Sequence, residues 1–485
     1  MNLGTILWIA TVVLGAFFLW IGFKVRHKAS ASFADYSIAG GSLPLFLIFF
    51  TEFANIMGVG NFVGHAAKGY ANGLPWLFFI LGEQGSKIIF ALVFAGFAGR
   101  YTYSTFIEMI DDLIVKDKVT RVIGAILACS IMIAWTGGQA KGFGTIFQVI
   151  TGANPVPIVF LFTAIYIVYT TLGGYYSLVW MDFVLGLMVI VFGGMFYFEA
   201  FKIVNFSFAE IGARLTAMGR PEMWSLSGAN YGVALTNFVT GCVGILAAQM
   251  YWQSCFAAKD SKTARNGLLA SGTIAIIFVM LTAIVGMIIY TVNPNLTGEQ
   301  PMPWFMMNMV PTIVAVGIFL CIMAAGMSSA DSNLNSATVL MTNDIIAVFK
   351  PDLTDKEMIF IVRVLTVIVG IIAAVVSIYS PSILDLFSRA YSMAGGGLVP
   401  LLVVGLLWKE RPEDPFQPGK RNSKVTPWGA RVGMITGAVL SQINSLGTYK
   451  ILIALAVSAI LIIVVSMMTR NSDSALHLQQ PKSGI

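Results

Sequence analysis

Residues 324–345, AAGMSSADSNLNSATVLMTNDI, place many hydroxyl, amide and carboxylate side chains inside a long apolar segment. On a helix, one face collects a small residue and three hydroxyls, with a carboxylate beside them: Ala325, Ser328, Ser329, Ser332 and Asp331. Such groups are costly inside a bilayer unless they are paired or hydrated, so the segment indicates a functional site. Oxygen ligands of this kind suit a hard cation such as sodium.

The composition places this segment in a membrane protein. Of 485 residues, 57% are hydrophobic and 11% are charged, and the mean hydropathy is +0.82. Ordinary soluble domains carry roughly 25% charged residues, and they could not hide this much apolar surface. The sequence therefore predicts an all-α polytopic protein surrounded by the lipid bilayer. The net charge of +6 does not indicate a nucleic-acid partner, because the basic residues lie mainly in short loops.

Apolar runs of about 20 residues are long enough to cross a bilayer as helices. Thirteen such spans are predicted, at 4–24, 43–68, 74–98, 119–149, 156–173, 178–201, 232–255, 268–292, 311–346, 358–379, 382–408, 427–446 and 449–469. The first run is too long for a signal-peptide core and lacks a small-residue cleavage site, so we expect it to be retained as a span.

The distribution of Lys and Arg predicts the orientation of these spans. With the N-terminus outside, the inner loops collect most basic residues, and the outer side keeps Lys68, Lys202, Arg214, Arg220 and Lys450. Cytoplasmic loops carry such an excess. We expect a multi-pass plasma-membrane protein, in a bacterium the inner membrane, with the C-terminus in the cytoplasm. Residues 471–485 are expected to form a short, disordered cytoplasmic tail.

Glycines interrupt two spans. Gly58, Gly60 and Gly64 lie close together in the second span, and the seventh carries the run TGCVG at 240–244. Interrupted helices at matching positions of two halves indicate a transporter site between inverted repeats. Close helix packing through small residues gives the same composition and is the alternative for either break alone.

Helix geometry predicts that two carboxylates lie at similar depth. Asp182 is about 7 Å inside the inner end of the sixth span, and Asp331 lies about 30 Å along the ninth, which enters from outside. With Ser328, Ser329 and Ser332 they would form an oxygen-rich pocket. The alternative is that Asp182 is interfacial and solvated.

Several segments together resemble the sodium:solute symporters, a family that includes bacterial proline, pantothenate, sialic acid and sugar symporters and the sodium–glucose carriers. The segments are AAGMSSADSNLNSATVLMTNDI at 324–345, FANI at 53–56, GGYYSLVWMD at 173–182, QSCFAAKD at 253–260 and PLLVVGLLWK at 400–409. One departure is Ser254, where the family usually has Arg.

The resemblance implies a LeuT-like architecture of five plus five helices in two inverted repeats, with broken helices. It divides one membrane transport domain, 1–485, into an extra first span at 4–24, repeats at 43–201 and 232–408, two last spans within 427–469, and the tail at 471–485.

The resemblance also implies sodium sites. The first would use backbone carbonyls of Phe53, Ile56 and Ala325 and the hydroxyls of Ser328 and Ser329. A second sodium, held in some members, would use Asp182, Asp331 and Ser332. Because Asp331 replaces the usual hydroxyl, it would either tighten this site for sodium or carry a proton instead.

Residues that would bind a solute are found near the broken spans and in the outer halves of others. The candidates are Glu52, Asn55, Gly60, Trp135, Gln139, Lys141, Gly241, Gly244 and Arg389. Sugar is disfavoured, because Gly60, Gly241 and Gly244 stand where sugar-transporting members have Gln, Asn and Tyr. The buried charges favour an amino acid or a small organic acid. Glu83 and Lys87, one turn apart, are interpreted as a structural ion pair.

The sequence therefore predicts a sodium-coupled secondary active symporter that imports a small polar organic solute by alternating access. A proton-coupled symporter using Asp331 or Asp182, and a transporter-like receptor that signals to a partner, remain alternatives. Nothing resembling a nucleophile–base pair, a transition-metal ligand cluster or a phosphate loop indicates an enzyme. We expect sodium as the coupling ion and no obligatory protein partner.

Overall fold

The computed structural model describes residues 2–29, 32–226 and 230–477, with side chains left out at 21–22, 25–29, 172–174, 176–177 and 471–477. The α-helices are α1 (Leu3–Ala29), α2 (Phe33–Ile38), α3 (Leu45–Ile56), α4 (His65–Asn72), α5 (Leu77–Phe90), α6 (Gly96–Ala98), α7 (Phe106–Ile110), α8 (Lys118–Thr151), α9 (Pro155–Lys202), α10 (Phe208–Ala217), α11 (Tyr231–Ala247), α12 (Gln249–Ala257), α13 (Ser261–Val292), α14 (Pro301–Asn308), α15 (Thr312–Met341), α16 (Ala347–Phe349), α17 (Asp355–Tyr379), α18 (Ile383–Leu407), α19 (Pro427–Leu440) and α20 (Lys450–His477).

Short π- and 3-10-helical turns join or extend these helices. They are η1 (Ala39–Gly41), η2 (Gly60–Gly64), η3 (Leu74–Trp76), η4 (Ala91–Ala95), η5 (Asp111–Val115), η6 (Pro221–Trp224), η7 (Thr342–Ile346) and η8 (Asn444–Tyr449). Local signals fix several starts, because a side-chain oxygen at the N-cap accepts an otherwise unpaired backbone N–H. Ser382 caps α18 in this way, and Thr354 with Glu357 forms a capping box at α17.

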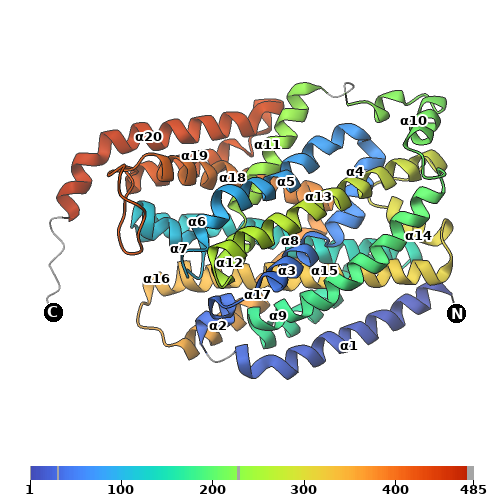
Figure 1. The fold of residues 1–485 in the computed structure, drawn as a ribbon, viewed down its shortest axis with the longest axis horizontal. Coiled ribbons are helices and arrows are strands. Elements are labelled where there is room, and N and C mark those ends of the chain that lie inside the picture. Colours follow the sequence, from blue (N-terminus) through green and yellow to red (C-terminus); the bar gives the residue numbers. More distant parts are fainter. Residues whose placement is uncertain (1, 30–31, 227–229, 478–485) are drawn as a thin grey trace.

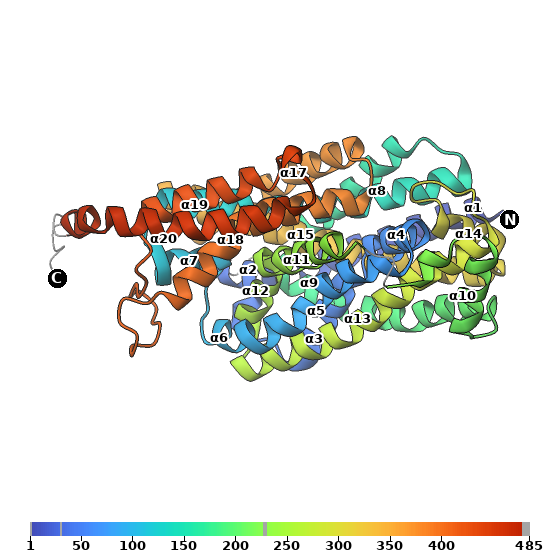
Figure 2. The ribbon, with the colours of Figure 1, turned by 90° about the horizontal axis from the view of Figure 1, so that it is seen from above.

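The long helices run along the long axis of the molecule, and the two chain ends lie at opposite ends of the bundle (Figure 1). The view from above places α19 and α20 along one edge and α13 along the opposite edge (Figure 2). The segment that carries the polar motif, α15 with η7 and α16, is the most enclosed candidate span, at 83% buried. It packs between α8 and α9, so its polar side chains face protein and not lipid.

The structure agrees with the prediction of membrane-spanning helices, but not with the predicted number of them. The described residues contain nine helices that are long and apolar enough to cross a membrane, or eleven if each bent pair is one span. Two predicted spans, 156–173 and 427–446, correspond to a shorter apolar helix at Pro155–Thr171 and to α19. The count of thirteen is therefore not confirmed.

Both predicted interruptions are bends in the structure. Helix α3 meets η2 and α4 at 45°, at residues 57–59, where the glycines predicted a break. Helices α11 and α12 meet at 43°, with the extended residue Ala248 between them. The second break therefore follows the predicted run at 240–244, which is helical and packs closely against α5.

The C-terminal tail differs from its prediction. Helix α20 continues to His477, so the backbone of residues 471–477 is helical and not disordered. Residues 478–485 lie outside the described part of the chain. The side chains of Gly173, Gly174, Tyr176 and Ser177, which open one of the family-like segments, also lie outside the description.

Glycines bring two helix pairs into backbone contact. A Cβ on Gly286 of α13 would lie 2.0 Å from the carbonyl oxygen of Ala66, and one on Gly69 of α4 would lie 2.0 Å from that of Ala283. Helices α5 and α11 approach in the same way at Gly82 and Gly241. Small residues permit such approach between membrane helices, where packing is a main source of stability.

We predict that Gly286→Ala lowers the thermal unfolding midpoint in detergent. The added methyl meets backbone that cannot move aside locally, and overpacking of this kind costs about 1–3 kcal/mol. Gly194→Ala is the matched control, because a Cβ there meets nothing within 4 Å. Equal midpoints for the two variants would show that α4 and α13 are not held in this contact.

Candidate functional site

The break in α3 is held by side chains from two other helices. Ser329 Oγ lies 2.7 Å from the carbonyl oxygen of Asn55 and 2.8 Å from that of Ala325. Gln139 Oε1 accepts the backbone N–H of Val59 at 2.7 Å. Gly58 makes this possible, because a Cβ there would lie 2.6 Å from Ser329 Oγ. Three oxygens, two of them backbone carbonyls, thus converge where α3 ends and α15 passes.

The carbonyl in contact with Ser329 belongs to Asn55, which lies between Phe53 and Ile56, the residues whose carbonyls the resemblance assigns to the first sodium. The Phe53 carbonyl accepts the backbone N–H of Met57 at 3.2 Å. The last turn of α3 ends at Ile56 and directs successive carbonyls around the helix axis.

A carboxylate lies next to this point. Ser328 Oγ donates a short hydrogen bond to Asp182 Oδ1, and Asn55 Nδ2 lies 3.4 Å from Asp182 Oδ2. Asp182 is fully buried, so the alternative of an interfacial, solvated carboxylate is excluded.

The second predicted carboxylate faces the same region. Asp331 lies within electrostatic range of Asp182 and within hydrogen-bonding reach of Tyr169. Among the described residues, Asp331 Oδ1 and Ser332 Oγ lack a well-formed hydrogen bond, although both residues are almost completely buried. Asp331 and Ser332 lie close enough to interact with each other, and neither oxygen has the well-formed partner that buried polar atoms nearly always have.

A cavity of about 40 Å³ adjoins this oxygen cluster on the other side of Asn55. One water needs roughly 10–15 Å³, so the cavity has room for a few waters. Its lining comes from both broken helices and from α5, α8, α15 and α18. It includes the polar and aromatic side chains of Asn55, His65, Glu83, Gln84, Lys87, Trp135, Gln139, Tyr251, Asn333, Phe387 and Tyr391.

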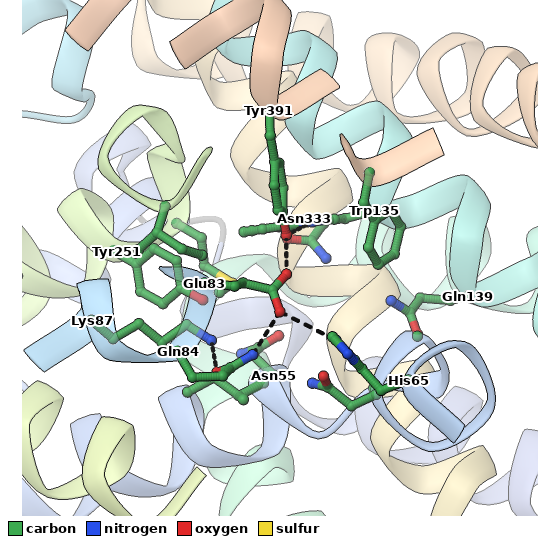
Figure 3. A pocket seen from close by; sticks show the side chains of 17 residues that line it. Asn55, His65, Glu83, Gln84, Lys87, Trp135, Gln139, Tyr251, Asn333 and Tyr391 are labelled. Atoms are coloured by element: carbon green, nitrogen blue, oxygen red, sulfur yellow. Dashed lines mark hydrogen bonds and ion pairs between the residues drawn. The ribbon is translucent and has the colours of Figure 1, made fainter. Parts of the chain in front are cut away.

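Glu83 stands at the centre of a hydrogen-bond network (Figure 3). The hydroxyl of Tyr391 donates to Glu83 Oε1 at 2.5 Å and accepts Trp135 Nε1–H at 2.8 Å. Gln84 Nε2 donates to Glu83 Oε2 at 2.8 Å, and His65 Nε2 lies 3.2 Å from the same oxygen. The network joins α4, α5, α8 and α18 across the cavity.

Lys87 differs from its interpretation as the ion-pair partner of Glu83. Its ammonium donates to Gln84 Oε1 at 2.5 Å and lies over the ring of Tyr251, 5.4 Å from the centroid. Within the described structure it forms no ion pair with Glu83. Gln84 bonds to both and separates them, as the close view shows (Figure 3).

The predicted solute residues divide into four groups. Asn55, Gly60, Trp135 and Gln139 line the cavity. Glu52 lies behind it, fully buried, where Ser254 donates to Glu52 Oε1 at 2.5 Å.

The glycines of α11 have a packing role. Gly241 fits against the backbone of α5, and a Cβ on Gly244 would lie 2.2 Å from the ring of Tyr391. Neither glycine lines the cavity, although Gly244 fixes the position of a side chain that does.

The two predicted basic ligands lie outside the cavity. Lys141 Nζ donates to the carbonyls of Ser377 and Ser380 at 3.3 and 2.8 Å, at the C-terminal end of α17, where a cation is favourable. Arg389 is exposed. Its neighbour Asp385 pairs with Lys68 at 2.9 Å.

Sequence reasoning missed most of the charged and aromatic lining, namely His65, Glu83, Gln84, Lys87, Tyr251, Asn333, Phe387 and Tyr391. One signal was present: Glu83, Gln84, Ser86 and Lys87 are four polar residues close together in an otherwise apolar span, which by itself indicates a functional site. The i, i+4 spacing of Glu83 and Lys87 favoured a local ion pair instead, so these residues were not predicted to line a solute site.

Comparison with known proteins identifies the family of the chain. The model of the "Sodium:solute symporter family" matches residues 36–414. The high-affinity choline transporter 1 of Drosophila melanogaster is 25% identical over 413 residues, covering 81% of this chain and 64% of that protein. The osmoregulated proline transporter of Bacillus subtilis is 24% identical over 505 residues, covering 97% and 95%.

The fold is also that of a solved transporter. The structure of a Na+-coupled sialic acid symporter in a substrate-bound outward-open state superposes with a TM-score of 0.79 at 18% identity, covering 96% of this chain and 98% of that one. The predicted fold class, an all-α membrane bundle of the LeuT-like type, is confirmed by this likeness. The chain belongs to the sodium:solute symporter family and is a multi-pass membrane transporter that couples a solute to sodium, not an enzyme.

Proposed function

We propose that this protein imports a small amino acid or organic acid together with sodium by alternating access. The observation that carries the proposal is the position of Asn55. Its backbone carbonyl and Nδ2 contact the oxygen cluster of α15 and α9, and its side chain lines the cavity. A cation bound at the cluster and a solute bound in the cavity would therefore order the same residue.

The proposed solute class fits the charge of the cavity. A sugar would leave the buried ammonium of Lys87 without an anionic partner, and a buried charge is costly unless it is paired. The relatives named above carry choline and proline, and the solved symporter carries sialic acid. All three solutes are organic ions or zwitterions, which supports a charged solute here.

The first sodium is proposed to bind where α3 breaks. Its ligands are the hydroxyls of Ser328 and Ser329, the carbonyl of Ala325 and carbonyls at the end of α3. By the resemblance these would be the carbonyls of Phe53 and Ile56, and the contact of Ser329 with the neighbouring Asn55 carbonyl supports this proposal. Hard cations prefer such oxygen ligands.

A second sodium is proposed between Asp182, Asp331 and Ser332. The two buried carboxylates repel each other, and a cation between them would relieve that repulsion. The unsatisfied Asp331 Oδ1 and Ser332 Oγ would also gain a partner. Each would replace part of the hydration shell that sodium loses on entering.

Closure of the cavity is proposed to involve the glycines of the broken helix. The Phe387 ring packs on Gly60 and on Gly138, and Leu384 packs on Gly64. Moving α18 away from these glycines would open the part of the cavity that Gly60 and Phe387 line. Sodium can favour such a state only by binding it better than the alternatives.

We also propose the repeat boundaries and the orientation given by the sequence. The repeats would be 43–201 and 232–408, with the N-terminus outside and the C-terminus in the cytoplasm. A bacterial inner membrane fits the similarity to bacterial relatives over nearly the whole chain. The proposal needs no further protein partner, since the oxygen cluster and the cavity are formed within one chain.

We predict that Ser328→Ala combined with Ser329→Ala raises the sodium concentration needed for half-maximal stabilisation by roughly tenfold or more, since each lost oxygen ligand is worth about 1 kcal/mol. Thermal unfolding in detergent, with sodium titrated against potassium, measures this without a known solute. Ser271→Ala is the control, because that buried hydroxyl bonds to Leu268 within its own helix. An unchanged sodium response in the double variant would remove this site from the proposal.

We predict that Asp182→Asn and Asp331→Asn each lower the Hill slope of the sodium titration toward one, while one ion still binds. The reason is that each change removes half of the negative charge at the second site. A slope equal to the parent's would contradict a second sodium there. A parent protein that ignores sodium and responds to protons alone would instead support proton coupling.

A further inference from the structure

The cavity contains two opposite charges, and their surroundings differ. Glu83 has three hydrogen-bond donors from the protein: Tyr391, Gln84 and His65. His65 Nδ1 accepts Trp76 Nε1–H at 3.0 Å, so the ring proton of a neutral His65 lies on Nε2, which faces Glu83. The hydrogen-bonding capacity of the Glu83 carboxylate is thus used by its neighbours, and the carboxylate in turn holds them in position.

The hydrogen-bonding capacity of the Lys87 ammonium is not used up in this way. An ammonium has three donors, and the described structure gives Lys87 one acceptor, Gln84 Oε1, and one aromatic face, that of Tyr251. The residue is 3% exposed, so its remaining donors can reach only groups or waters held inside the cavity. Glu52 and Glu83 lie within electrostatic range without accepting a hydrogen bond from it. The ammonium therefore has donor capacity directed at the cavity that it lines.

Two hydrogen-bond acceptors among the residues that line the same cavity lack donors. Asn55 Oδ1 and Asn333 Oδ1 are buried and accept no hydrogen bond from any residue that the structure describes. The amide orientation of Asn55 is fixed, because its Nδ2 faces two acceptors, the carbonyl of Thr51 at 2.7 Å and Asp182 Oδ2 at 3.4 Å. Its Oδ1 is then the atom left for a ligand.

We propose that the solute is a zwitterionic amino acid whose carboxylate binds Lys87 and whose ammonium binds Asn55 Oδ1 and Asn333 Oδ1. This deepens the proposed function and rests on it. The aromatic side chains of Trp135, Tyr251 and Phe387 would enclose the remainder of the solute, and the small cavity favours a small side chain.

Neither half of the zwitterion satisfies the cavity alone. An organic acid without an amine leaves both amide oxygens without donors, and a buried unsatisfied polar group is costly. An amine without a carboxylate leaves Lys87 unpaired and adds a second positive charge to the same cavity. The amino acid satisfies all three groups at once, so selectivity follows from groups that would otherwise be left unpaired.

The test uses the purified full-length protein in saturating sodium and sets of three matched compounds: alanine, ethylamine and lactate; serine, ethanolamine and glycerate; proline, pyrrolidine and tetrahydrofuran-2-carboxylate. Ligand binding raises the thermal unfolding midpoint according to occupancy. We expect at least one amino acid to stabilise the protein and both of its fragments to fail at the same concentration. Equal stabilisation by an amine or by an acid would overturn the proposal, as would the failure of every amino acid in a wider panel.

Substitution of Lys87 tests the carboxylate contact. Lys87→Met keeps the length of the side chain and removes its charge, and we expect the affinity for the amino acid to fall roughly 10- to 100-fold, as for a lost charged hydrogen bond. Lys87→Arg should recover part of the loss. Lys141→Met should leave affinity unchanged, because Lys141 caps α17 and does not line the cavity. Unchanged affinity in Lys87→Met would overturn the assignment.

An independent variant covers the case in which Lys87→Met does not fold. Asn333→Leu removes one ammonium acceptor, and we expect it to weaken binding of the amino acid. Unchanged binding would contradict that contact. Stabilisation by sodium alone is measured in every variant. If sodium fails to stabilise the parent, the symport proposal fails; if sodium stabilises it and the amino acid does not, only the present inference fails.

Discussion

A helix that stops inside a membrane leaves backbone groups that lipid cannot satisfy, and this constraint explains the centre of the molecule. Helix α3 ends at Ile56, and its free groups are met by Ser329 of α15 and Gln139 of α8. The polar motif of α15 is thus needed first to make the break tolerable. In the proposed function this oxygen cluster also binds an alkali cation, and one set of side chains would then serve both stability and ion binding.

The same break places one residue, Asn55, between the oxygen cluster and the cavity. Asn55 contacts Asp182 with its amide nitrogen and Ser329 with its carbonyl, and it borders the cavity. Coupling between an ion and a solute requires that each changes the free energy of binding the other. If the proposed ion and solute sites are correct, Asn55 would meet that requirement over a short distance, without a long chain of intervening contacts.

The sequence predicted features that depend on local chemistry. Glycines at 58–64 marked the break in α3, and the hydroxyl and carboxylate pattern of α15 marked the oxygen cluster, because such groups have few other reasons to lie in an apolar span. It failed where tertiary contacts decide. Lys141 and Arg389 resembled solute ligands by depth alone, yet Lys141 caps α17 and Arg389 is exposed. Glu83 and Lys87 resembled a pair by spacing, yet Gln84 separates them.

The contacts made by glycines are of two kinds, those against backbone and those against side chains. Backbone meets backbone where α4 touches α13 and where α5 touches α11, with no side chain between to change rotamer. Where α18 touches the broken helix, the contacting atoms are instead the ring of Phe387 and the end of Leu384, which can swing aside. We therefore expect α4 to move together with α13, and α5 with α11, and we expect sliding between helices to be easiest where side chains of α18 meet η2.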